Sequence, residues 1–214
     1  MSRLIDKGLE NQSVLLIRMG ELTYQTLSIS IKGYIESSIV QGQIREMSDR
    51  LMLMADKVED RSFELITRFQ PVASDLRAIK SYMKIGYDFA RYGRYALDIS
   101  YINDQISGLS ECDIEIKESV EKMCEKVLQM VKISIDALRK HDVDLAKTIV
   151  ETEREVDAMY QSHLNKLLEE ETGNSRSITS RVLMSRYLER IADHAVYVCE
   201  SIVYIVTGEK IRLR

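Results

Sequence analysis

Two pairs of carboxylates in the C-terminal third of the chain have the spacing of a binding site. Glu189 and Asp193 are four residues apart, and so are Glu153 and Asp157. This spacing places both members of a pair on one face of a helix. If the two helices are antiparallel neighbours, the four carboxylates converge and offer the oxygen ligands that hard cations prefer. The alternative is two solvated acidic faces.

A row of cations could bind an anion instead. Its members recur at spacings of three and four residues, with Tyr87 among them, and we call this set the cation stripe: Arg77, Lys80, Lys84, Arg91 and Arg94. Guanidinium and ammonium groups on one helical face suit phosphate, a nucleotide or an acidic partner. The alternative is a solvated face paired with acids such as Glu59 or Glu64.

Catalytic patterns are missing from the sequence. The three histidines, His141, His163 and His194, are scattered, and none completes the Glu-x-x-His motif of a diiron bundle. No phosphate-binding loop or nucleophile elbow is present. We therefore expect no enzyme and no catalytic residue. His194, next to Asp193, is interpreted as either a metal ligand or a solvated side chain.

The composition bounds the protein class. The chain has 214 residues, 45% of them hydrophobic and 30% charged, which is enough for a substantial core. A net charge of −4 gives no basic field for nucleic acid, so we expect no nucleic-acid partner. Three cysteines without a C-x-x-C pair indicate reduced thiols. The charged N-terminus and the short apolar runs predict no signal peptide and no membrane span, hence a cytoplasmic protein.

The elements that must position these residues are long helices. One proline and nine glycines are too few for a turn-rich fold. Expected breaks lie at 37–42, Pro71, Gly108 with the capping-box pair Ser110 and Asp113, Asp142, 171–175 and Thr207-Gly208. They divide the chain into six helices of about 25 to 35 residues each.

Hydrophobic periodicity predicts how these helices pack. The last helix carries apolar residues at alternating spacings of four and three: Met184, Leu188, Ile191, Ala195, Val198, Ile202 and Ile205. The preceding helix shows the same spacing at Leu145, Ile149, Thr152, Val156 and Met159. We predict an all-α fold of two tandem three-helix bundles, in residues 1–108 and 109–214, with an internal repeat at an offset of 99 residues that aligns Arg77 with Arg176 and Arg91 with Arg190.

The amino-acid sequences of three segments resemble those of the PhoU family of phosphate-uptake regulators. They are QPVASDLR, RYLERIADHAVYVCE and IVYIVTGE, and the resemblance covers nearly the whole chain as two tandem repeats. It implies a cytoplasmic protein, often a homodimer, that represses the phosphate-starvation response. The implied partners are the nucleotide-binding subunit of the phosphate ABC transporter and a sensor kinase.

The resemblance also implies metal sites of iron or zinc on each repeat. Glu153, Asp157, Glu189 and Asp193 match the family's motif positions in the second repeat. In the first repeat the corresponding positions hold Ala90 and Arg94, and their partners fall near Ser48 and Met52. None of these four residues can neutralise a polyvalent cation, so we expect metal at the second repeat only.

Two other functions stay open at this stage. One is a metal-free helical interaction module for another transporter or signalling partner. The other is a carboxylate-bridged metalloenzyme, which would need redox turnover.

Overall fold

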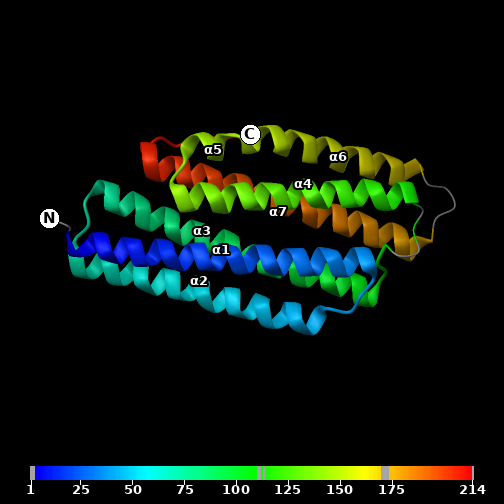
Figure 1. Ribbon diagram of the computed structural model, residues 1–214, viewed down its shortest axis with the longest axis horizontal. Coiled ribbons are helices and arrows are strands. Elements are labelled where there is room, and N and C mark those ends of the chain that lie inside the picture. The colour runs from blue at the N-terminus through cyan, green and yellow to red at the C-terminus, as the bar shows by residue number, and fades with distance from the viewer. Residues whose placement is uncertain (1–2, 110–111, 113, 170–173, 214) are drawn as a thin grey trace.

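The computed structural model describes residues 3–109, 112, 114–169 and 174–213 (Figure 1). Within these ranges every element is a helix, so the predicted all-α class is confirmed. The elements are α1 (Leu4–Glu36), α2 (Gln41–Phe69), α3 (Ala73–Gln105), α4 (Ile114–Lys140), α5 (Val143–Lys147), α6 (Ile149–Glu169) and α7 (Ser175–Thr207).

Local sequence explains most helix ends. Pro71 lies just before α3, which begins at Ala73. The Asp142 side chain accepts a hydrogen bond from the Leu145 N–H at 2.9 Å and caps α5, and Asn174 caps α7 in the same way. Gly208 ends α7 with a φ of 78°, a conformation that favours glycine. The capping-box residues Ser110 and Asp113 lie outside the described residues.

One predicted helix is divided. The segment with the Leu145 to Met159 seam was expected to be continuous, but Thr148 separates α5 from α6. Its hydroxyl donates to the Leu145 carbonyl at 2.7 Å, and its N–H reaches the Asp144 and Leu145 carbonyls. These short-range bonds tighten the turn and interrupt the regular ladder. The second repeat therefore has a two-piece outer helix where the first has α2.

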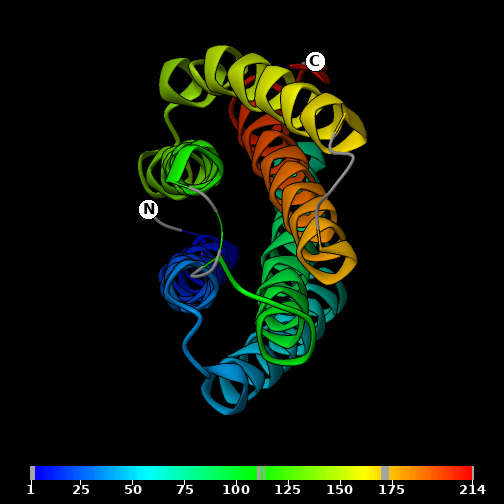
Figure 2. The same cartoon turned by 90° about the vertical axis from the view of Figure 1, so that its right-hand side faces the viewer.

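The two repeats pack side by side. Seen end-on, α1 and α4 form one layer and α3 and α7 the other, while α2 and α6 lie at opposite outer ends (Figure 2). Helix α2 packs on α1 and α3, and α6 packs on α4 and α7. Contacts of α1 with α4 and of α3 with α7 join the repeats. The predicted arrangement of two three-helix bundles is confirmed.

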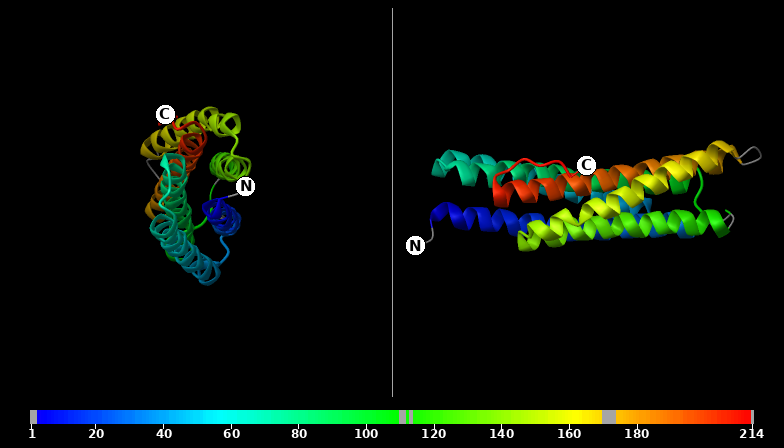
Figure 3. Two further views of the ribbon diagram at one scale, coloured as in Figure 1. Left: turned by 90° about the vertical axis from the view of Figure 1, so that its left-hand side faces the viewer. Right: turned by 90° about the horizontal axis from the view of Figure 1, so that it is seen from above.

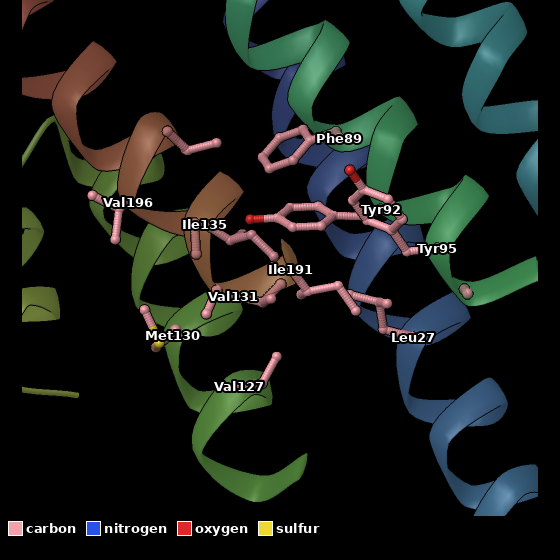
Figure 4. Packing of buried hydrophobic residues seen from close by; sticks show 14 of the residues in the cluster. Leu27, Phe89, Tyr92, Tyr95, Val127, Met130, Val131, Ile135, Ile191 and Val196 are labelled. Carbon is pink, nitrogen blue, oxygen red and sulfur yellow. The ribbon is translucent and has the colours of Figure 1, made fainter. Parts of the chain in front are cut away.

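The bundles share one core instead of two. Phe89, Tyr92 and Tyr95 of α3 face Ile191 and Val196 of α7, with residues of α1 and α4 closing the cluster (Figure 4). The last-helix seam is buried as predicted, apart from the partly exposed Ile205. Because both repeats contribute to this core, their relative position is fixed by apolar packing.

After α7 the chain folds back along the bundle, where the Leu213 N–H donates to Glu200 at 3.0 Å (Figure 3). The three cysteines are free, and burial raises the pKa of the Cys124 and Cys199 thiols. Of the helices in the described ranges, none has the length and apolar character needed to cross a bilayer.

Candidate functional site

The second-repeat carboxylates lie on the facing helices α6 and α7. Counting along the antiparallel helices from the His163 to Ser185 contact of 3.4 Å places Glu153 within two residues of the level of Asp193, and Asp157 within two residues of the level of Glu189. Glu153 is only 4% exposed, and the Glu189 side chain 14%. The interpretation as two fully solvated acidic faces therefore does not describe these two residues.

The four carboxylates do not make a ready site for a metal ion. Among the described residues, no three His, Cys, Asp or Glu side chains are grouped so that they could hold one metal ion. Glu189 accepts a hydrogen bond from Arg186 at 2.8 Å, so a fixed cation already occupies one of the expected ligands. A tight iron or zinc site needs at least three protein ligands around one point. The residues present do not fit such a site in this arrangement.

The first-repeat positions meet at a pocket between α2 and α3. Met52, Ala90 and Arg94, three of the four positions expected to have lost metal ligands, line a cavity of about 530 Å³. The fourth, Ser48, is buried in α2. We call this cavity the first-repeat pocket. The sequence thus identified a real meeting point of the two helices, although no ligand type follows from it.

The cation stripe is divided among different surroundings. Arg91 and Arg94 line the first-repeat pocket together with the acids Asp56 and Glu59. Of the two acids suggested as partners, Glu59 is therefore close, whereas Glu64 pairs with Arg68 at 2.7 Å.

Two other members of the stripe have their own environments. The Lys84 Nζ lies 5.4 Å from the ring centroid of Tyr197 on α7, so it faces the second repeat. Lys80 is exposed on α3. The stripe is therefore not one open anion-binding face.

Arg77, the first member of the stripe, belongs to α3, and its side chain lies beside the C-terminal end of α7. A Cβ built on Gly208 would be 3.4 Å from the Arg77 Cζ. Its repeat equivalent, Arg176, donates to the carbonyls of Gln105 and Ile106 at the end of α3, at 2.8 and 3.1 Å. A cation beside the last carbonyls of a helix is stabilised by the helix dipole. Each repeat thus places an arginine at the end of the other repeat's last helix.

Three polar side chains meet between α3 and α7, and we call them the inter-repeat cluster: Asp88, Tyr95 and His194. The His194 Nδ1 lies 2.8 Å from the Asp88 Oδ1, and its Nε2 lies 3.2 Å from the Tyr95 hydroxyl. Asp88 is 2% exposed, and the His194 side chain 13%. The interpretation of His194 as a solvated side chain was therefore wrong, and among the described residues the side chain belongs to no group of three or more potential metal ligands.

Charge in this cluster is costly, and the structure compensates it. Burial raises the pKa of Asp88, while the hydrogen bond and the charge of His194 oppose that shift. On the outer side, Arg91 donates to the Tyr95 hydroxyl at 3.3 Å and lies 5.3 Å from its ring centroid. The cluster therefore connects a surface arginine to a buried carboxylate across the repeat boundary.

Sequence reasoning missed this cluster although a signal was present. Tyr95 and His194 are 99 residues apart, the offset at which the two repeats align. A residue that contacts its own repeat equivalent lies on the axis that relates the repeats. Asp88 has Tyr187 as its equivalent, so the acid exists in one repeat only.

A family model and curated relatives of this chain point to the same family. The family model "PhoU domain" matches the chain twice, over residues 16–102 and 120–202. A "Phosphate-specific transport system accessory protein PhoU homolog" from Clostridium acetobutylicum is 30% identical over 99% of this chain and 98% of its own length. A protein of the same description from Pseudomonas putida is 31% identical over 99% of this chain and 84% of its own length.

Solved structures agree with the fold. The crystal structure of PhoU from Pseudomonas aeruginosa superposes with a TM-score of 0.87 at 28% identity, covering 95% of this chain and 99% of that one. The phosphate transport system regulatory protein PhoU from Streptococcus pneumoniae gives a TM-score of 0.77 at 20% identity, over 97% and 99% of the two chains. The second likeness concerns the fold alone.

Proposed function

Because this chain belongs to the PhoU family, we propose that it is an accessory protein that regulates phosphate transport. The observation that carries the proposal is the double family match together with a relative of that description aligned over nearly the full length of both chains. The proposal assigns no reaction to the protein. The protein would act as a cytoplasmic adaptor that binds the phosphate ABC transporter and thereby reduces phosphate uptake and the starvation response.

The shared core supports an adaptor role. Since α3 and α7 are joined by apolar packing and by the inter-repeat cluster, the two repeats present their outer helices at fixed relative positions. A rigid body of this kind can engage two surfaces of a partner without a large ordering cost. A partner that separates the repeats would have to expose the buried Asp88 and Tyr92.

We propose the metal-free form of this adaptor. The absence of a three-ligand group among the described residues, and the Arg186 contact to Glu189, favour it over the iron- or zinc-bound form. The alternative of a metal-free module for a different transporter or signalling partner predicts the same chelator resistance but a different bound protein.

The test is a pull-down with the purified nucleotide-binding subunit of the phosphate transporter, with and without chelator and phosphate. Specific retention that survives the chelator supports the proposal. Retention only with added iron or zinc would restore the metal-bound form, and no retention under any condition would refute the adaptor role. Light scattering on the same sample tests the homodimer that the family resemblance implies.

A further inference from the structure

A groove between α1 and α2 has properties that the proposed function does not use. It lies at the end of the bundle that holds the N-terminus, where α2 runs back along α1 (Figure 1), and encloses about 640 Å³. We call it the α1/α2 groove. This volume lies within the range of ligand-binding pockets, and the groove shares no lining residue with the first-repeat pocket between α2 and α3.

The floor of the groove is apolar. Leu65 lies at its base and packs so closely on α1 that a Cβ on Gly8 would overlap it. Val14 and Phe69, at 43% and 36% exposed, place further apolar surface along the groove. Partly exposed apolar side chains in a concave surface are typical of a docking site.

The walls of the groove are basic, against the overall charge of the chain. Four cations line it and only one acid, although acids outnumber bases in the whole sequence by 34 to 30. That acid, Glu64, already pairs with Arg68 at 2.7 Å. Among the described residues, Lys7, Arg18 and Arg61 take part in no ion pair, so their charge is available to a partner.

The second repeat has a hollow beside its outer helix that is more evenly charged. A surface hollow between α4 and α6 is lined by Lys122, Lys126 and Glu155, and Lys126 pairs with Glu155 at 2.6 Å. One unbalanced cation remains there, compared with three in the α1/α2 groove. Of these two hollows, the α1/α2 groove therefore carries the larger basic excess.

We propose that the α1/α2 groove binds an acidic amphipathic helix of a partner protein. Its apolar residues, at spacings of three and four, would pack along Val14, Leu65 and Phe69, while flanking Asp or Glu side chains pair with the basic walls. A helix can pack on this surface by placing the ridges of its side chains into the grooves between those of α1 and α2. This inference rests on the proposed function, because it specifies the kind of segment by which the partner protein would bind the adaptor.

The test uses a labelled synthetic helix of about 18 residues, with Leu on one face and Glu on the flanks, which spans about 27 Å. Its binding to the full chain is measured by fluorescence anisotropy. A matched peptide with Lys in place of Glu, and vesicles of anionic phospholipid, are tested in parallel. We expect saturable binding of the acidic peptide only.

The groove variant is Arg18→Glu/Arg61→Glu, and the control is Arg45→Glu/Arg50→Glu. The control makes the same charge change at exposed sites on α2, at least 11 residues before Arg61. Each lost pair becomes a repulsion, so the groove variant should weaken binding at least tenfold and the control less than twofold. Circular dichroism checks that both variants stay folded.

Several outcomes would overturn the inference. They are no binding of the acidic peptide, equal binding of the Lys peptide, binding of vesicles in its place, or equal loss in the control variant. Self-association that the groove variant abolishes would identify a second copy as the occupant instead. If the groove variant still retains the transporter subunit normally, the groove is not the docking site, but the proposed function stands. If the wild type binds the peptide but no transporter subunit, only the proposed function is refuted.

Discussion

Replacing His194 with alanine tests the inter-repeat cluster directly. The substitution removes the donor 2.8 Å from the Asp88 Oδ1, while the Asp88 Oδ2 is buried without a hydrogen bond to the described residues. Removing the only partner of a buried carboxylate leaves an uncompensated charge, which costs about 3 to 5 kcal/mol. Protonating the orphaned carboxyl limits this cost: between its ordinary pKa of 3.8 and pH 7 the cost is at most about 4 kcal/mol, at about 1.36 kcal/mol per unit.

The expected loss is therefore about 3 to 4 kcal/mol at pH 7, a large part of the stability of an ordinary domain. For 214 residues this corresponds to a fall of about 7 to 9 °C in melting temperature. The pH dependence has a definite sign. A carboxyl whose folded pKa is raised destabilises the folded state as pH increases, so the loss in His194→Ala should be greatest near pH 8 and smallest near pH 4.

The assay is thermal unfolding of the wild type, His194→Ala, Asp88→Asn and the double variant. Because Asp88→Asn removes the buried charge, the double variant should recover about half of the loss seen in His194→Ala. Strictly additive losses, or an unchanged melting temperature for His194→Ala at neutral pH, would refute the argument that this pair carries energy across the repeat boundary.

Three further predictions concern other sites. Elemental analysis should find only trace iron and zinc in both the wild type and Glu189→Ala/Asp193→Ala; near-stoichiometric metal in the wild type alone would establish the metal site. Burial lowers the pKa of His163, so the wild type should lose stability as pH falls from 7 to 5, and His163→Gln should flatten that profile in urea unfolding; equal slopes would contradict this. Gly93→Ala should destabilise by about 1 to 2 kcal/mol, because its Cβ would lie 2.8 Å from a side chain of α2, whereas Gly42→Ala, with nothing within 4 Å, should not.

The fold followed from the sequence because its signals are local. The period of the apolar residues in α7 predicted which face is buried, and Gly208 and Asp142 marked helix boundaries. The break at Thr148 was missed because threonine is tolerated in a helix. The hydroxyl and N–H bonds of Thr148 to Leu145, which the sequence does not reveal, show that the turn has tightened.

Only part of the candidate site could be predicted from the sequence, because the burial of a side chain depends on neighbouring helices that residue spacing does not reveal. Four-residue spacing placed Glu153 and Asp157 on one face, but it did not indicate that packing of α6 on its neighbours buries Glu153. Asp88 and His194 are separated by 106 residues, and their contact exists only through the packing of α3 on α7. The repeat offset would have indicated it, had the aligned positions been compared as neighbours in space.

The contact between Tyr95 and His194 also bears on why the two repeats share one chain. In an isologous dimer of a single-repeat protein, every side chain on the twofold axis faces an identical copy of itself. Covalent linkage removes that constraint, so the two axis positions can hold a histidine and a tyrosine. The histidine can then contact an aspartate that only the first repeat contains. Fusion of two copies thus permits an asymmetric polar centre that no symmetric pair of single repeats could encode.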